Sequence, residues 1–328
     1  MRVAKNFKTI VGILMVSLGW VFLSLGDCIG QQFPSRPITI IINYAAGGAT
    51  DIAVRPMAKI TEKKLGVPVV ISNRPGGGGT IGMTELARSK PDGYTLGTVT
   101  IGAAIVVPMM QKVSYNALTD FEYICGFGSY IYGIFTRTDS RFKTMQDVVR
   151  EAKANPGKVT YGTMSPSIAI GLKYVEIKEN IRITYIPYQS GTEAVANLVG
   201  GHVDLCIASA PETIKFIEGK EIRALAAVAT ERWAILPDVP TMKDLGYDID
   251  ITGWMAMGTP AGVSKEHLSI FYDAFKFGHA DPEVKELHEK LYSRAPYISG
   301  EEVKKIYSKR QVEWKPLIDS LASDQKKK

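Results

Sequence analysis

Four short segments carry residue types that could hold a small anion. Each follows an apolar, β-branched run and opens a pattern typical of a helix; they are Ala46–Asp51, Gly76–Thr80, Thr163–Ser167 and Gln189–Thr192. The first amides of a helix are unpaired and carry partial positive charge, so they can bind carboxylate or phosphate without Arg or Lys. Glycine, serine and threonine are also ordinary helix caps, which explains any single segment. Four such segments together favour a binding site.

The sequence contains little that indicates covalent, acid–base or metal catalysis. The GxSxG elbow of hydrolases fails at Ser190, because Gly191 follows it but Tyr188 stands two residues before it. Asp51 could be catalytic, but it is more simply a cap that complements a helix dipole. The histidines lack metal-ligand spacing: His202, His267, His279 and His288. We therefore expect no enzyme, no metal site and no cofactor.

The glycine segment also has the form of a dinucleotide fingerprint. Gly77, Gly79 and Gly82 have the GxGxxG spacing between a predicted strand and a predicted helix. The next predicted strand, Tyr94–Thr100, ends without the acidic residue that binds a ribose. The pattern therefore does not indicate a nucleotide-dependent enzyme.

Several larger side chains could line a cleft or pair with an anion. Arg55 and Arg74 could bind a carboxylate bidentately, but helix starts do not need them, and we expect structural ion pairs. Aromatic side chains could also face a ligand, although packing is the simpler role for each: Tyr44, Tyr185, Tyr188 and Trp254.

Alternating strands and helices must position these segments. The first strand is expected at Ile38–Asn43, followed by a helix from Thr50 to Leu65 with Gly66 as its C-cap. Further strands are expected at Val67–Ser72, Tyr94–Thr100, Val159–Gly162, Ile183–Pro187, Val203–Ala208 and Ile222–Ala229. Further helices are expected at Met145–Ala154, Thr192–Val199, Ser264–Gly278, Pro282–Leu291 and Glu301–Leu321. This order predicts two α/β units, with ligands at the carboxyl ends of the strands.

The N-terminus predicts export from the cytoplasm. A basic start precedes the uncharged apolar run Thr9–Gly26, which is typical of a signal peptide, and we expect cleavage near Gly30. A retained anchor remains an alternative, as does a lipoprotein with its lipid on Cys28. Cys125 and Cys206 stand in apolar runs, so we expect buried thiols, although an oxidising compartment permits a disulfide.

The charge distribution argues against a nucleic-acid partner. The formal net charge is +6, and the Lys and Arg residues are scattered apart from the tail Lys326–Lys328. A nucleic-acid-binding protein concentrates its basic residues on one face or stripe. A mildly basic protein suits an anionic ligand, but net charge alone is weak evidence.

Several longer motifs resemble one family of receptors. They are Pro34–Ala58 (PSRPITIIINYAAGGATDIAVRPMA), Asn73–Gly82 (NRPGGGGTIG), Pro91–Leu96 (PDGYTL), Pro187–Asp204 (PYQSGTEAVANLVGGHVD), Ile222–Arg232 (IRALAAVATER) and Leu236–Trp254 (LPDVPTMKDLGYDIDITGW). In this order they resemble the substrate-binding receptors of tripartite tricarboxylate transporters, the TctC/Bug family, over nearly all of the chain after the N-terminal segment.

The resemblance implies a type II periplasmic-binding-protein fold, with two α/β lobes around a ligand cleft. We expect a signal peptide at 1–30, the first lobe at 31–132, the second at 133–252, and a return to the first lobe at 253–328. The hinge crossings should lie near Phe127–Thr136 and Asp250–Thr259, where Gly128, Gly133, Gly253 and Gly258 can absorb dihedral change.

The resemblance also implies a ligand and partners. In such receptors, backbone N–H groups from both lobes hold a carboxylate, often with waters. Carried over to this chain, the ligand-binding residues are Tyr44, Ala46, Gly47, Gly48, Thr50, Asp51, Asn73, Gly76, Gly78, Thr163, Ser165, Ser167, Gln189, Ser190 and Gly191. We expect a periplasmic monomer that delivers a small carboxylate to a permease with a large and a small subunit. An exported sensor that uses the same clamp remains the alternative.

The second-lobe segments depart from the family pattern. Thr163–Ser167 replaces a glycine-rich loop, and Gly171-Leu172 stands where His-Leu is typical. Gln189-Ser190 replaces the usual Lys-Gly after Pro187-Tyr188. The first-lobe grip on a carboxylate should therefore be retained, whereas the selectivity of the second lobe is open, with Met164 narrowing its pocket.

Overall fold

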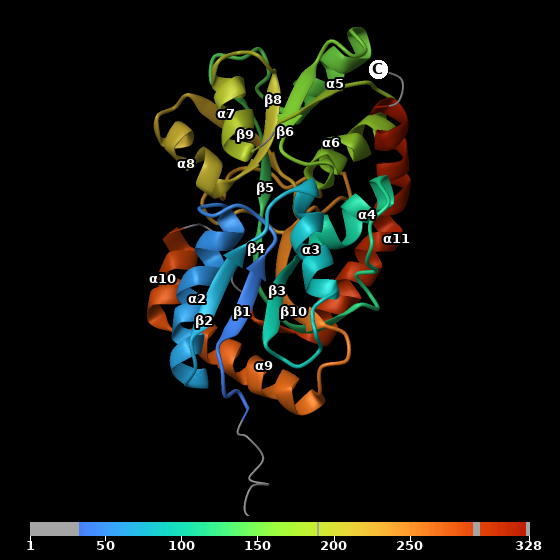
Figure 1. Cartoon of the computed structure of the whole chain (residues 1–328). Helices are drawn as coiled ribbons and strands as arrows, with labels where there is room; N and C mark the ends of the chain where they lie inside the picture. The colour runs from blue at the N-terminus through green and yellow to red at the C-terminus, as the bar shows by residue number, and fades with distance from the viewer. Residues whose placement is uncertain (1–32, 189, 291–295, 326–328) are drawn as a thin grey trace, which may run out of the picture. The chain divides into compact units, whose positions relative to one another are not determined.

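The computed structural model describes residues 33–188, 190–290 and 296–325 (Figure 1). The expected signal peptide at 1–30, with Cys28, lies outside these residues. The fold described below belongs to Pro37–Lys328. Among the described residues, no helix is both long enough and apolar enough to span a bilayer.

The first sheet has six strands. Their bounds are β1 Ile38–Ile42, β2 Val69–Asn73, β3 Thr95–Thr100, β4 Phe121–Tyr130, β10 Gly253–Pro260 and β11 Ile298–Ser299. They lie in the order β11-β4-β10-β3-β1-β2. β2 and β3 run parallel to β1, β10 is antiparallel to β3 and β4, and β11 is antiparallel to β4. The β-branched run at Ile38–Ile42 is almost wholly buried, as expected for a central parallel strand.

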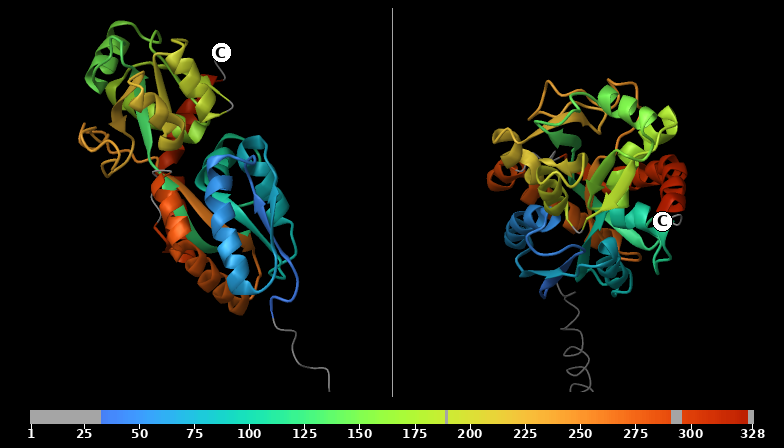
Figure 2. Two further views of the ribbon diagram at one scale, coloured as in Figure 1. Left: turned by 90° about the vertical axis from the view of Figure 1, so that its left-hand side faces the viewer. Right: turned by 90° about the horizontal axis from the view of Figure 1, so that it is seen from above.

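Two groups of helices accompany this sheet. The first is α2 Ala49–Leu65, α9 Lys265–Ala280 and α10 Pro282–Lys290, and these pack against one another. Figure 2 shows the blue α2 beside the orange α9. The second is the 3₁₀ turn η1 Gly77–Gly79, α3 Thr80–Ala87, the π-helical turn η2 Gly102–Val106 and α4 Val107–Met110. Gly66 ends α2 with φ 72°, and its N–H donates to Glu62 O, as the sequence predicts.

The second sheet has five strands. Their bounds are β5 Tyr132–Arg137, β6 Thr160–Thr163, β7 Thr184–Pro187, β8 Leu205–Ser209 and β9 Ile222–Ala227, in the order β7-β6-β8-β5-β9. β7 and β8 run parallel to β6, and β5 is antiparallel to β8 and β9. The helices are α5 Met145–Ala154, α6 Pro166–Glu179, α7 Gly191–Val199 and α8 Ala210–Glu218.

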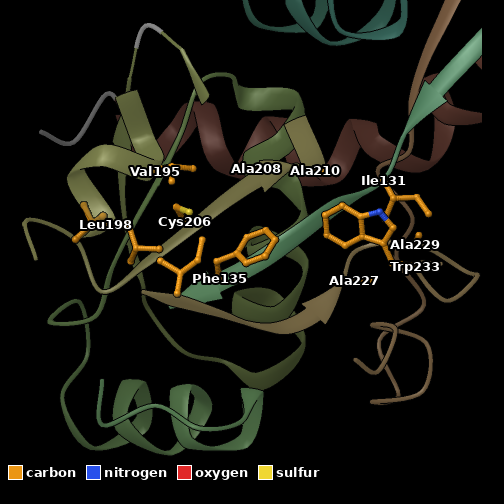
Figure 3. Packing of buried hydrophobic residues seen from close by; sticks show 12 residues of the cluster. Ile131, Phe135, Val195, Leu198, Cys206, Ala208, Ala210, Ala227, Ala229 and Trp233 are labelled. Carbon is orange, nitrogen blue, oxygen red and sulfur yellow. The ribbon is translucent and has the colours of Figure 1, made fainter. Parts of the chain in front are cut away.

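The core of the second sheet explains two sequence features (Figure 3). Phe135 and Trp233 meet edge to face, with ring centroids 6.0 Å apart. A β-carbon at Gly133 would lie 2.7 Å from both rings, so glycine is required there for packing. Cys206 is fully buried in this cluster. Cys206 and Cys125 are both buried free thiols, which confirms the simpler of the two expectations for the cysteines.

The chain passes between the sheets at two places and is accompanied by a long helix. Ile131 alone separates β4 from β5, and the stretch from Val228 to Thr252 leads from β9 back to β10. The C-terminal helix α11 Gly300–Gln325 packs against β4 of the first sheet and α6 beside the second. The predicted lobe boundaries, and the role of the predicted glycines as hinges between the lobes, remain proposals.

Candidate functional site

The carboxyl ends of β1, β2 and β3 meet at one edge of the first sheet, because these strands are parallel. Asn43, which is fully buried and directly follows β1, connects the ends of β1 and β3 through hydrogen bonds. Its N–H donates to Thr98 Oγ1 at 3.1 Å and its Nδ2 donates to Thr100 Oγ1 at 3.0 Å. The Thr98 hydroxyl in turn donates to Asn43 Oδ1 at 2.7 Å. Asn43 was not among the predicted site residues, although a polar residue that ends an apolar run is a visible signal in the sequence.

The loop after β1 is a tight turn that leads into α2. The Gly48 N–H donates to Ala45 O at 3.1 Å, and the Gly47 N–H donates to Asp51 Oδ2 at 2.9 Å. Gly47 and Gly48, both predicted ligand residues, therefore use their amides within the loop. Among the described residues, no acceptor takes the N–H groups of Ala49 and Thr50, the first two residues of α2. Unpaired amides at a helix start have the geometry and partial positive charge that suit an anion.

The sequence suggested that Asp51 caps the amides of its own helix, and this prediction is wrong. Its side chain is buried and accepts hydrogen bonds from Gly47 N–H, from Arg55 Nε at 2.8 Å and from Asn73 Nδ2 at 2.9 Å. Burial alone would raise the pKa of Asp51, but the hydrogen bonds from Arg55, Gly47 and Asn73 hold it below its ordinary value. Asn73 also donates to Tyr44 O at 3.0 Å and accepts from Arg55 at 2.9 Å. Asp51 and Asn73 thus fix the shape of the loop, and direct ligand contact by either remains a proposal.

The glycine loop after β2 depends on backbone conformations that other residues rarely adopt. Gly76, Gly77, Gly78 and Gly79 all have positive φ, of 121°, 58°, 67° and 94°. A β-carbon at Gly79 would lie 2.8 Å from Asn43 Nδ2, so the loop packs closely on the end of β1. The Tyr44 hydroxyl donates to Gly78 O at 3.5 Å.

The second sheet has a corresponding edge, where the parallel strands β6, β7 and β8 end and α6, α7 and α8 begin. Ser165 Oγ and Ser167 Oγ lie 2.6 Å apart at the start of α6. Thr163 Oγ1 is fully buried and has no hydrogen-bond partner within the described part of the chain. Ser190 Oγ accepts from Glu193 N–H at 3.1 Å at the start of α7, beside Gly191. Gln189, also a predicted ligand residue, lies outside the described residues.

The two edges approach each other at Gly102, which sequence analysis missed. A β-carbon at Gly102 would lie 3.2 Å from Ser167 Oγ and 3.7 Å from Tyr44 Oη. Tyr44 is also within 3.5 Å of the Thr100 hydroxyl, which donates to it. Burial raises the pKa of Tyr44, and the hydrogen bond with Thr100 opposes this. Tyr44 and Ser167 therefore come together, while Ala46 lies exposed on the turn.

The larger side chains have structural contacts, as expected. Arg74 Nε pairs with Glu85 at 2.9 Å, and Arg55 pairs with Asp51. Tyr185 stacks on Tyr161 with centroids 5.3 Å apart. Tyr188 fills the space over Gly162, where a β-carbon would lie 2.5 Å from its ring.

Comparison with known proteins identifies the family. Residues 53–322 match the tripartite tricarboxylate transporter family receptor, TctC. The chain belongs to this family. The TctC receptors are solute-binding proteins and not enzymes, and among the described residues no cluster of His, Cys, Asp and Glu could hold a metal ion.

Individual relatives of this TctC receptor agree with the match. The "UPF0065 protein in gbd 5'region" of Cupriavidus necator is 33% identical over 89% of each chain. The structure of the periplasmic binding protein BugD is 27% identical with a TM-score of 0.76, over 89% of this chain and 99% of that one. The structure of R. palustris Rpa4515 with adipate has a TM-score of 0.77 at 21% identity, over 89% of this chain and 98% of that one, a likeness of fold. This TctC receptor thus has the two-lobed α/β fold of periplasmic binding proteins.

Proposed function

We propose that this receptor captures a small carboxylate between its two lobes, outside the cytoplasm, and delivers it to a tripartite tricarboxylate-type permease. The observation that carries the proposal is the approach of Ser167 to Tyr44 and Gly102, at the carboxyl edges of both sheets. The unused amides of Ala49 and Thr50 lie at the first of these edges. Helix-start amides hold a carboxylate through hydrogen bonds and the helix dipole.

The relatives support this choice of ligand class. The structure of Rpa4515, which shares the fold, is described as being with adipate, a dicarboxylate. The basic, apolar N-terminal segment supports export, and family membership supports a permease with a large and a small subunit. The ligand-binding residues of the second lobe in this proposal are Thr163, Ser165, Ser167, Gln189, Ser190 and Gly191. Those of the first lobe are Tyr44, Ala46, Gly47, Gly48, Thr50, Asp51, Asn73, Gly76 and Gly78.

A thermal-shift screen tests the binding function. The mature chain is heated with mono-, di- and tricarboxylates and amino acids, and each sample is assayed afterwards for chemical change in the ligand. A ligand at 100 times its dissociation constant adds about 2.7 kcal/mol to the free energy of unfolding. We expect a clear shift with at least one carboxylate and no turnover. A protein that carries no retained ligand and shows no shift with any carboxylate would refute the proposal.

A further inference from the structure

One acidic side chain stands at the second-lobe edge and was not among the predicted ligand residues. Glu212 is the third residue of α8, which begins directly after β8. Its Oε2 accepts hydrogen bonds from Ser209 N–H at 2.7 Å and from Ser209 Oγ at 2.9 Å. Because β8 is parallel to β6, α8 begins at the same edge as α6 and α7. Glu212 therefore belongs to the edge that carries the second-lobe ligand loops.

The other oxygen of Glu212 points to a predicted ligand residue. A β-carbon at Gly191, the first residue of α7, would lie 2.0 Å from Glu212 Oε1 and 2.2 Å from Cδ. Any side chain at Gly191 would displace this carboxyl group. Glycine at this position thus makes room for an acidic group beside a loop in which the family resemblance predicts contact with the ligand.

Tyr130 contacts the first-lobe edge and is affected by the charge of Glu212. The Tyr130 hydroxyl donates to Ala49 O at 3.1 Å, at the helix start whose amides are unused. Burial raises the pKa of both Tyr130 and Tyr132 above the ordinary range, and the nearby charge of Glu212 adds to both shifts. Tyr130, whose hydroxyl contacts the first turn of α2, therefore lies within the electrostatic influence of Glu212.

Among the described residues, no cation neutralises Glu212. Within the described residues its hydrogen-bond donors belong to Ser209, and no Lys or Arg is among the groups that act on it. Burial raises the pKa of Glu212, and the two Ser209 donors oppose this rise. A desolvated carboxylate with one oxygen unpaired gains from a donor supplied by a ligand.

We propose that Glu212 determines specificity, its Oε1 accepting a hydrogen bond from an ammonium or hydroxyl group of a ligand whose carboxylate binds the first turn of α2. The inference rests on the proposed function, because it takes the carboxylate grip as given. The preferred ligand is then an amino or hydroxy monocarboxylate. A second carboxylate placed at Glu212 would be repelled by like charge.

Matched acids test this inference. For carbon skeletons of three to six atoms, calorimetric titration compares the 2-amino acid, the 2-hydroxy acid, the unsubstituted acid and the dicarboxylate. A hydrogen bond to a charged group changes binding by about 10- to 100-fold. We expect the amino or hydroxy acid of the best skeleton to bind wild type about 10- to 100-fold more tightly than the unsubstituted acid. The difference in affinity between the 2-amino acid and the 2-hydroxy acid identifies whether an ammonium or a hydroxyl group is recognised.

Two variants separate the role of Glu212 from general effects. Glu212→Gln should bring the matched acids to within a few-fold of one another and should improve binding of the dicarboxylate. Glu193→Gln, at the equivalent third position of α7 and exposed, should leave the preference unchanged. Circular dichroism confirms that both variants fold.

The outcomes of these titrations distinguish a failure of the role of Glu212 from a failure of the proposed receptor function. Equal binding of all four matched acids by wild type, or a preference that survives in Glu212→Gln, would overturn the role of Glu212 and leave the receptor function standing. Failure of every acid to bind would overturn the receptor function itself.

Discussion

Asp51 Oδ2 accepts the Gly47 N–H at 2.9 Å, so a buried carboxylate holds the turn that presents the start of α2. The bond acts from inside the fold, since Asp51 is 2% exposed. It explains how an acidic residue can stand in a loop proposed to bind an anion. Its charge is directed to Gly47, Arg55 and Asn73, and the Ala49 and Thr50 amides remain available.

Asp51→Asn should destabilise the protein. The amide keeps the size of the side chain but loses its charge and turns an N–H₂ group towards one of the present donors. We expect a loss of about 1.5–3 kcal/mol in the free energy of unfolding, the range for hydrogen bonds to a charged group. Urea titration measures this loss. The control is Glu85→Gln, which breaks the exposed ion pair with Arg74 and should lower the free energy of unfolding by less than about 1 kcal/mol. Equal effects of the two substitutions would contradict the role of Asp51.

The effect of Asp51→Asn on the free energy of unfolding should depend on pH. The pKa of Asp51 is held below its ordinary value of 3.8, so the unfolded chain binds a proton more readily than the folded one. The contribution of Asp51 to stability is therefore present above that value and is lost as the pH falls below it. The difference in unfolding free energy between wild type and Asp51→Asn should shrink on acidification. A difference that is constant down to acid unfolding would refute this.

Gly48→Val should weaken ligand binding while the fold is kept. Gly48 has φ −76°, which any residue adopts, but a β-carbon there would lie 3.1 Å from Ala45 O. A branched side chain must therefore shift the turn just before the Ala49 amide. We expect at least a tenfold loss of affinity, about 1.4 kcal/mol, by calorimetry with the carboxylate found in the screen. Full affinity in the folded variant would move the site away from this loop.

Ligand binding should close the two lobes. The chain crosses between the sheets through Ile131 and through the stretch before Gly253, which is where rotation is expected. Gly133 and Gly253 are tightly packed, since β-carbons there would lie 2.7 Å from Phe135 and 2.9 Å from Tyr132, so packing as well as flexibility explains these glycines. Small-angle scattering should show a smaller radius of gyration at saturation with ligand. An unchanged radius would count against a clamp.

Sequence patterns predicted many of the regular elements because burial and capping act locally, but β4, β5, β10 and α8 were not among them. The helix Met145–Ala154 was placed without error, and Ile38–Asn43 was placed within one residue of β1. The π-helical turn at Gly102 was missed because it follows β3 without a polar capping residue to mark its start. Its role depends on Ser167, which is distant in the sequence and is brought near only by the tertiary fold.

Other features of the site carried a signal that was overlooked. Ser209-Ala-Pro-Glu212 has the S-x-x-E spacing of a capping box, and it opens α8. The contact of Glu212 with Gly191 could not be predicted, because it depends on how β8 and β7 flank β6. The orientation of Asp51 was predicted incorrectly because its strongest partners, Arg55 and Asn73, lie on different elements.

The carboxylate is proposed to bind where Tyr44, Gly102 and Ser167 meet. Titration calorimetry of wild type and Gly102→Val, with the carboxylate from the screen, tests this claim most directly. A β-carbon at Gly102 would already lie 3.2 Å from Ser167 Oγ, so the larger valine side chain should displace Ser167 and occupy the space between it and Tyr44. We predict one ligand per chain in wild type and at least a tenfold weaker affinity, about 1.4 kcal/mol, in a Gly102→Val variant that still folds. Unchanged affinity in that variant would contradict the claim.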